Sequence, residues 1–236
     1  MSVADAENAA SVEIAWEWAA RLPDAFASSE PPQDSGSLFT FAVRDFLRAG
    51  FRLGSALRPG DWHLDDTRGA LAENRELRAM ISEQYLVVPD IVVYRSPIAS
   101  REAGRSPDVT VANLSPLLDD AQLSRNHPLL HASVSCKITM HADRAQNMRT
   151  EALNLIRNRK GRAPSIVAVT AEPLPTRLSS LALGTGDVDC VYHAALPELR
   201  QALEAVGNED QLDMLNTLVE GRRIRDIADL VLDLLI

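Results

Sequence analysis

Apolar residues recur at helical spacing in the first part of the chain. The pattern covers residues 5–21 and 38–57, and a more polar version follows over residues 65–84. Prolines, serines and a glycine separate the first two stretches, and a turn at 58–61 closes the second. The spacing therefore predicts a helical N-terminal region over about residues 1–57 and a third, polar helix after it.

The middle of the chain changes to short runs of apolar and β-branched residues, which are typical of strands. Such runs occur at 85–95, 131–140, 165–172 and 189–194. Proline lacks the N–H that a central ladder needs, so Pro89 places Asp90 at an irregularity of the first run. Residues 143–158 have helical spacing and separate the second run from the third. This strand–helix–strand order predicts a parallel pair of strands with the helix on one face.

The rest of the chain completes an α/β pattern. Residues 195–236 return to helical spacing and predict two or three helices, whereas the Ser- and Pro-rich segment 96–120 is typical of an excursion on the surface. The chain shows no internal repeat. The order of elements predicts a single α/β domain over residues 1–236, with a central mixed sheet between helices on both faces.

The composition is that of a globular protein with a core. Of the 236 residues 46% are hydrophobic, which is too many for a disordered chain, and no apolar run is long enough to span a bilayer. The N-terminus lacks the basic stretch and apolar block of a secretory signal, so we expect a cytoplasmic protein. The two cysteines, Cys136 and Cys190, lie in strand-like runs and are expected to be buried thiols.

The chain is acidic overall but basic in one segment. A net charge of −9 argues against a generic binder of polyanions. Six basic residues nevertheless gather between residues 143 and 162, against only Asp143 and Glu151. They are Arg144, Arg149, Arg157, Arg159, Lys160 and Arg162. The result is a local basic segment of the kind that phosphate contacts need.

Three residues around the second strand run form a candidate site for a divalent cation. Asp90 lies at the strand irregularity, Lys137 comes late in the next run, and Glu151 is on the helix that follows. Glu151 falls at the edge of that helix's apolar stripe, so we expect it to point toward the sheet. Buried carboxylates are costly unless they are paired or bind a metal. In the alternative, Glu151 pairs with Arg149 or Arg144 on a solvated rim while Asp90 caps a turn, and spacing alone favours this alternative.

An ordered string of motifs favours the cation site over this alternative. It consists of Pro89-Asp90, Ser135-Cys136-Lys137, His141-Ala142-Asp143-Arg144 and Glu151. The string resembles the type II restriction endonucleases of the NgoMIV group, which belong to the PD-(D/E)xK nuclease superfamily. The likeness runs nearly continuously from residue 129 to residue 234, with an earlier island at 58–62. This resemblance implies the restriction endonuclease-like fold, an α/β/α sandwich, and Mg²⁺-dependent cleavage of double-stranded DNA.

The resemblance also implies a role for each residue of the candidate site. Asp90 and Glu151 are the implied Mg²⁺ ligands, and the Cys136 carbonyl is a candidate for a further ligand. Ser135 stands where the superfamily has an acidic residue two positions before the lysine, so Glu151 supplies the missing carboxylate from the helix. Lys137 orients the attacking water or helps to deprotonate it. Because side chains alternate along a strand, the Cys136 thiol is expected in the core rather than as a nucleophile.

DNA recognition is implied by a second motif. In this group an Arg-Ser-Asp-Arg motif reads a CCGG core in the major groove, where arginine donates to guanine and aspartate accepts from cytosine. The chain keeps Asp143 and Arg144 but has His141 in place of the first arginine. Arg177 matches an arginine that reads the outer base pair. In the alternatives, His141 is a surface histidine, Asp143 caps the helix, and Arg177 is a loop residue that contacts phosphate or solvent.

A further departure from the family pattern lies in the helix predicted over 38–57. The family has a glutamate there that approaches the metal site, and Thr40 occupies the aligned position. Asp45 follows a little over one helical turn later. Either a second metal position is weakened or Asp45 substitutes for the glutamate.

The implied function is type II restriction: cleavage of a palindrome with a CCGG core, GCCGGC being one form, to leave 5′-phosphate and 3′-hydroxyl ends. A palindrome requires two-fold symmetry, and the group implies a homotetramer of two dimers, with the apolar C-terminal helices as candidate interfaces. A cognate DNA methyltransferase would protect the host. Two alternatives stay open: a cleavage-impaired DNA-binding protein of the same fold, and a structure-specific repair nuclease.

Overall fold

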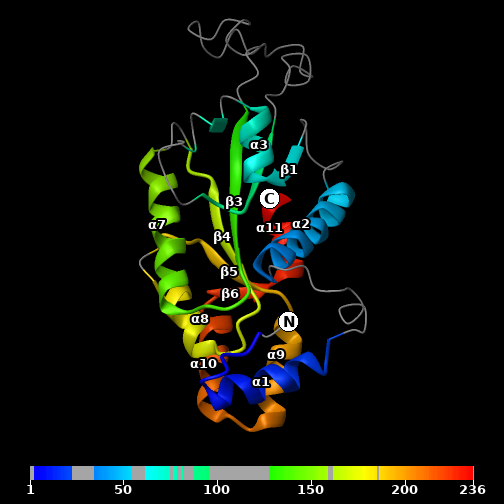
Figure 1. Ribbon diagram of the computed structural model, residues 1–236, viewed down its shortest axis with the longest axis vertical. Coiled ribbons are helices and arrows are strands. Elements are labelled where there is room, and N and C mark those ends of the chain that lie inside the picture. The colour runs from blue at the N-terminus through cyan, green and yellow to red at the C-terminus, as the bar shows by residue number, and fades with distance from the viewer. Residues whose placement is uncertain are drawn as a thin grey trace, which may run out of the picture.

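Six strands form one continuous sheet with helices on both faces (Figure 1). The computed structural model describes residues 3–22, 35–54, 62–74, 77–78, 81, 88–95, 128–158, 162–184 and 186–235. The predicted surface segment 96–120, the turn at 58–61, and Arg159 and Lys160 of the basic segment lie outside the described residues. The predicted α/β architecture with a central mixed sheet is confirmed.

The sheet changes direction at its middle. In spatial order its strands are β1 (Trp62–Asp66), β2 (Ile91–Arg95), β3 (Leu129–Lys137), β4 (Ser165–Thr170), β5 (Cys190–His193) and β6 (Ile224–Asp226). The first three pair antiparallel, whereas β3, β4, β5 and β6 pair parallel. β3 therefore borders an antiparallel half and a parallel half, and its carboxyl end is where residues from both halves meet.

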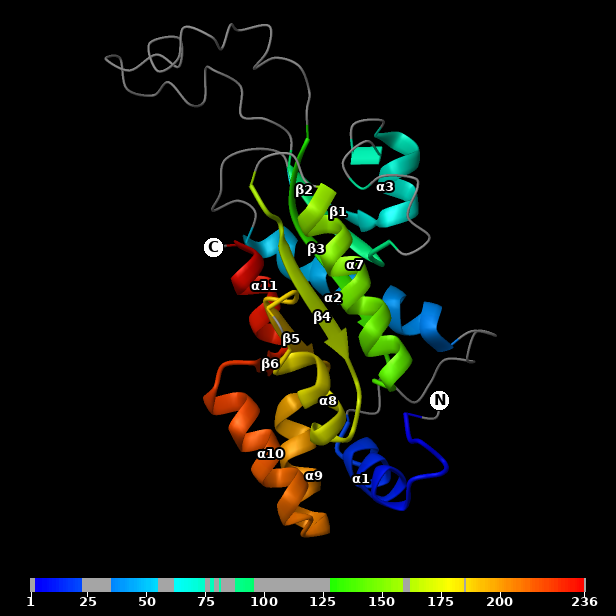
Figure 2. The same cartoon turned by 90° about the vertical axis from the view of Figure 1, so that its left-hand side faces the viewer.

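Helices cover both faces of the sheet and one of its ends (Figures 1 and 2). They are α1 (Ala9–Ala19), α2 (Ser35–Gly54), α3 (Thr67–Glu73), α7 (Ala142–Asn158), α8 (Pro175–Ala182), α9 (Leu196–Val206), α10 (Glu209–Glu220) and α11 (Ile227–Leu235). α7 covers one face, and α2 and α11 cover the other (Figures 1 and 2). None of the helices in the described part of the chain is both long and apolar enough to cross a membrane.

The predicted crossover is present as β3–α7–β4. β3 and β4 pair in parallel register, and α7 buries an apolar stripe that includes Met148, Ala152 and Leu155. Side chains alternate along β3, as expected for a central strand. Val134 and Cys136 join the larger core with residues of α2, and Ser135 between them faces α7. This alternation decides which side chains of β3 can reach α7.

Four elements differ from their predictions. β1 occupies 62–66, which includes the predicted start of the polar helix at residue 65, and α3 ends at Glu73 because Asn74 is already extended. β6 lies within a segment predicted as helical and is held as a strand by pairing with β5. Residues 175–182 form α8 rather than a loop, because Pro175 fits the first turn of a helix.

His193, the last residue of β5, joins three parts of the fold. The ring is fully buried, and its Nδ1 accepts a hydrogen bond from the Ala195 N–H at 3.2 Å. Nε2 therefore carries the proton and donates to the Glu172 carbonyl, also at 3.2 Å. The Trp18 ring of α1 packs edge-on against the imidazole. Burial lowers the pKa of His193 to about 4, since a charged ring here would lose its hydration.

This depressed pKa predicts acid sensitivity. The unfolded chain protonates His193 near its usual pKa of 6.5 and the folded chain only near 4, so the free energy of unfolding falls as the pH drops through that window. The share of His193 in this fall is about 3 kcal/mol. Urea titrations at pH 7, 5.5 and 4.5 measure it, with His193→Gln as the control that cannot take up the proton. Parallel pH profiles for the two proteins would contradict the assignment.

Candidate active site

Asp90 lies where the start of β2 meets the end of β3, rather than at an irregularity inside a strand. It immediately precedes β2, and its carbonyl accepts a hydrogen bond from the Thr67 N–H at the start of α3. Its carboxylate Oδ2 accepts two hydrogen bonds from β3: the Cys136 N–H at 2.7 Å and the Lys137 Nζ at 2.9 Å. One oxygen thus anchors both the backbone and the side chain at the end of β3, whereas Oδ1 is not used by either contact.

Cys136 and Lys137 face opposite sides of the sheet, as predicted. The Cys136 side chain is buried in the larger core, and burial raises its thiol pKa well above the usual value. A thiol that stays protonated and buried is a poor nucleophile. Lys137 is about one-third exposed and pairs with Asp90, so its ammonium lies at the surface beside that carboxylate.

Glu151 reaches the same place from α7. Its side chain is only 3% exposed, and its Oε1 accepts a hydrogen bond from the Ser135 hydroxyl. The alternative in which Glu151 pairs with an arginine on a solvated rim is therefore wrong. Burial raises the pKa of Glu151 to about 7; the Ser135 hydrogen bond and the Lys137 charge oppose this shift, and the Asp90 charge adds to it. The charges of Asp90, Lys137 and Glu151 thus act on one another.

The donor set fits a hard divalent cation that binds few protein ligands. No group of three or more His, Cys, Asp and Glu side chains that could hold a metal ion occurs among the described residues. The end of β3 offers two carboxylates instead, one of them buried with a raised pKa. Mg²⁺ is commonly bound by one or two carboxylates together with water and substrate phosphates. A closed side-chain cage, as in structural zinc sites, is not needed for that ion.

The segment after β3 carries the residues predicted to read the DNA core. α7 begins at Ala142, so Asp143 lies in its first turn with an exposed side chain. Asp143 is therefore not the helix cap that the alternative proposed, although a negative charge in the first turn suits the helix dipole. His141 is half-buried just before the helix. The Arg144 guanidinium turns back to the Thr139 hydroxyl and carbonyl.

Arg177 belongs to α8 and is held by acidic groups that the sequence did not single out. Its Nη2 pairs with the Asp5 carboxylate near the N-terminus, and its Nη1 lies 4.0 Å from Oε1 of Glu172. The interpretation of Arg177 as a solvent-exposed loop residue is therefore wrong. Asp5 is 172 positions away from Arg177, so nothing in the spacing pointed to this pair. Glu172 could have been suspected, because it is an acidic residue directly after an apolar strand.

Thr40 and Asp45 lie on α2, the helix in which the resemblance implies a glutamate near the metal site. Asp45 is half exposed, and its carboxylate lies 3.8 Å from Nε of the neighbouring Arg44. Nη1 of Arg44 also pairs with Asp66 at 3.2 Å, next to the Thr67 that contacts Asp90. α2 thus presents an arginine, bracketed by two acids, toward the β1–α3 junction.

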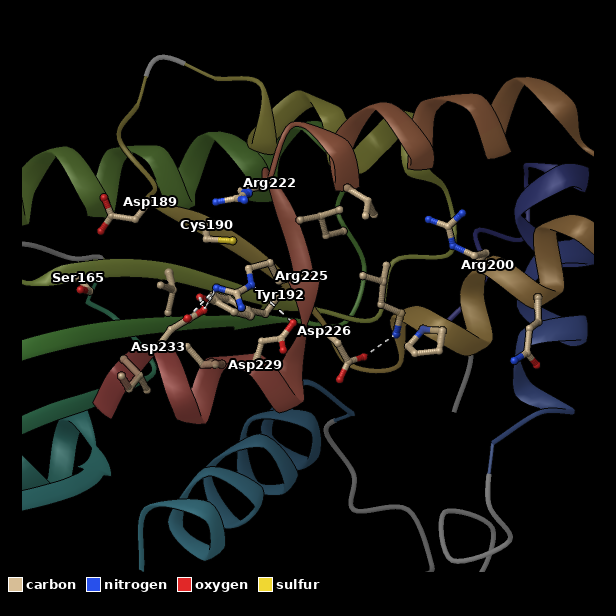
Figure 3. A pocket seen from close by; sticks show the side chains of 18 residues that line it. Ser165, Asp189, Cys190, Tyr192, Arg200, Arg222, Arg225, Asp226, Asp229 and Asp233 are labelled. Carbon is tan, nitrogen blue, oxygen red and sulfur yellow. Dashed lines mark hydrogen bonds and ion pairs between the residues drawn. The ribbon is translucent and has the colours of Figure 1, made fainter. Parts of the chain in front are cut away.

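A cavity of about 840 Å³ opens elsewhere, beside β5, β6 and α11 (Figure 3). None of the predicted site residues lines it. Asp233 binds Arg225 at 2.5 Å and accepts from the Tyr192 hydroxyl at 2.6 Å, and Asp229 also pairs with Arg225. These charged groups of the cavity satisfy one another, so its walls resemble a structural ion-pair network rather than a reaction centre. The chemistry points to the end of β3 instead.

Comparison with known proteins identifies the family of the chain. The family model described as NgoMIV restriction enzyme matches residues 1–70 and 63–236. The chain is also 43% identical over 255 residues to the type II restriction enzyme NgoMIV of Neisseria gonorrhoeae, and the match spans 99% of this chain and 89% of that protein. With both matches running over nearly its full length, the chain belongs to the NgoMIV restriction enzyme family of type II restriction endonucleases.

Proposed function

We propose that this type II restriction endonuclease uses Mg²⁺ to cut double-stranded DNA at a palindrome with a CCGG core, GCCGGC being one form, and leaves 5′-phosphate and 3′-hydroxyl ends. The observation that carries the proposal is the meeting of Asp90, Lys137 and Glu151 at the end of β3. Two carboxylates beside an ammonium provide both a cation site and a group that can act on water.

Each residue of the site has a defined part in the proposed reaction. Asp90 and Glu151 would hold Mg²⁺, with the Cys136 carbonyl as a further ligand; when bound, the cation lowers the pKa of water and offsets charge on the phosphate. The Ser135 hydroxyl donates to Glu151 and keeps that carboxylate aimed at the end of β3. Lys137 would hold the attacking water in line with the scissile bond through its ammonium. Oδ2 of Asp90 fixes Lys137, which leaves Oδ1 for the cation.

The proposed base contacts follow from donor and acceptor types. Asp143 is exposed at the start of α7 and would accept a hydrogen bond from cytosine N4. Arg144 and Arg177 would donate to guanine O6 and N7, at the core and at the outer base pair respectively. To do so, Arg144 must break its hydrogen bonds to Thr139. Arg177 must either bind Asp5 and guanine together or release Asp5. The imidazole of His141 cannot present the two parallel N–H donors of an arginine guanidinium, so we propose that it makes a weaker contact with guanine.

A palindrome carries two identical half-sites, so the active unit must contain two copies related by two-fold symmetry. We propose a homotetramer built from two such dimers. The C-terminal helix α11 is a candidate interface because Leu232 is 61% exposed on it. We also propose a cognate DNA methyltransferase, because an enzyme that cuts short palindromes needs protected sites in the host DNA. We propose a cytoplasmic location, because the enzyme must act where the DNA is.

A digest tests the cleavage and its specificity. A plasmid that carries two GCCGGC sites and several other CCGG contexts is incubated with Mg²⁺, and the fragment ends are sequenced. We expect discrete cuts with one constant sequence at every end, 5′-phosphate termini, and no cutting in EDTA. Cuts at sequences without CCGG, or cutting that needs no metal, would contradict the proposal.

Substitutions at the end of β3 test the site itself. Asp90→Ala removes a metal ligand and Lys137→Ala removes the ammonium, so each should lower single-turnover cleavage by about 10³-fold or more. Specific DNA binding in Ca²⁺ should stay within about tenfold of wild type, because neither residue reads a base. Arg21→Ala serves as a control, since its side chain makes an ion pair and a hydrogen bond to Glu17 on α1, away from the end of β3. Retained cutting by either site variant would overturn the assignment.

A further inference from the structure

Glu172 is a buried carboxylate that the proposed reaction does not use. Its side chain is fully buried, two residues after β4 ends. Burial raises its pKa, and this shift is opposed by two backbone hydrogen bonds and by the charges of Arg177 and His141. A buried carboxyl group is costly, so its contacts indicate what it stabilises.

The contacts of Glu172 join the two segments that carry the candidate base-reading residues. Oε2 accepts a hydrogen bond from the Met140 N–H at 2.7 Å, directly before His141. Oε1 accepts from the Leu174 N–H at 3.1 Å, and Leu174 is the N-cap residue of α8. One carboxyl group therefore ties the start of α7 to the start of α8.

The same carboxyl group faces Arg177. Nη1 of Arg177 is buried, has no hydrogen-bond partner within the described ranges, and lies 4.0 Å from Oε1 of Glu172. Asp5 holds Nη2 from the opposite side. The guanidinium is thus placed between two acids, one fully buried and one on the N-terminal segment.

Further hydrogen bonds join the segment after β3 to the segment after β4. The Ala171 N–H donates to the Ile138 carbonyl at 3.0 Å, and the Thr170 hydroxyl donates to the same carbonyl at 3.2 Å. Thr170 Oγ1 also accepts from the Glu172 N–H at 3.2 Å. The segment 138–141 and the segment 170–174 are therefore bonded at several points, and the Glu172 side chain supplies the contact to Met140, directly before His141.

We propose that Glu172 is a positioning residue that sets DNA specificity, because it fixes the core-reading start of α7 and the outer-reading Arg177 relative to each other. This inference rests on the proposed function for the assignment of those two reading elements. Glu172 does not touch DNA itself, since it is fully buried. Neighbouring base pairs are about 3.4 Å apart along the duplex, so reading two of them with separate elements requires a fixed spacing between those elements.

Glu172→Gln separates positioning from burial. Glutamine has nearly the same shape, but only one of its two terminal groups can accept a hydrogen bond. The amide NH₂ then faces either the Met140 N–H or the Leu174 N–H, donor against donor, and the negative charge beside Arg177 is gone. We expect both reading elements to shift while the end of β3 stays intact.

The experiment compares single-turnover cleavage of three duplexes: the cognate site established by the digest, the site with one outer base pair changed, and the site with one core base pair changed. Glu172→Gln should reduce the preference for the cognate duplex at both changed positions by about tenfold or more. Asp5→Asn is the matched control, because it removes one acid from Arg177 without touching Met140. It should reduce the preference at the outer position only.

A purely structural role for Glu172 predicts a different result. A general loss of stability would lower the rate on all three duplexes together and leave their ratios at the wild-type values, which would overturn the inference. If Glu172→Gln does not fold, Glu172→Asp is used, since it keeps the charge but withdraws the carboxylate by one methylene group. The same loss at both positions supports the inference, and unchanged ratios overturn it.

Arg144→Ala and Arg177→Ala distinguish failure of the inference from failure of the proposed function. If each arginine variant loses preference at its own base pair while the Glu172 variant keeps both preferences, only the inference falls. If the arginine variants keep the wild-type preferences, the assignment of the reading elements is wrong and the inference falls with it.

Discussion

The structure depends on holding carboxyl groups at the carboxyl end of a central strand. Asp90 approaches the end of β3 from β2, Glu151 approaches it from α7, and Glu172 lies beside it after β4. Each carboxylate gains backbone or hydroxyl hydrogen bonds that offset part of the lost hydration. The energetic cost of burying a carboxylate is seen at Glu151, whose pKa is raised to about 7 by burial. A fold optimised for stability alone would place apolar side chains here.

β3 separates apolar from polar side chains, because successive side chains of a strand point to opposite faces of the sheet. Its residues toward α2 are apolar and complete the larger core. Ser135 and Lys137 face the α7 side, where Ser135 donates a hydrogen bond to Glu151 and Lys137 pairs with Asp90. Ser135 is uncharged and the second carboxylate comes from α7, so two acids need not lie on nearby positions of one strand. The mixed sheet supports this arrangement, since β2 arrives antiparallel and delivers Asp90 to the point where β3 ends.

Much of this arrangement could be predicted from the sequence, and the exceptions share a physical cause. The β3–α7–β4 unit and the inward direction of Glu151 follow from periodicity, because one helix face or one strand face repeats over several turns or residues. β1 and β6 were missed because β1 buries only Leu64 on an edge and β6 has three residues that become a strand by pairing with β5. Local patterns carry little information about such elements.

The candidate site shows the same division. Asp90 and Lys137 were chosen by type and motif, but their contact spans 47 positions and no local pattern predicts it. The resemblance to a known family supplied what spacing could not, namely that these residues act together. It did not supply Asp5 or Glu172, which act on Arg177 from distant parts of the chain. Long-range pairs of this kind are visible only in the folded protein.

The central claim is that Asp90 and Glu151 form one cation site at the end of β3. Electron paramagnetic resonance of Mn²⁺, a stand-in for Mg²⁺, measures binding directly in the presence of duplex DNA. The account predicts that Asp90→Asn and Glu151→Gln each weaken Mn²⁺ binding by at least about tenfold, whereas Ser135→Ala, which keeps both carboxylates, has a smaller effect. Wild-type Mn²⁺ affinity in the Glu151→Gln protein would contradict the account.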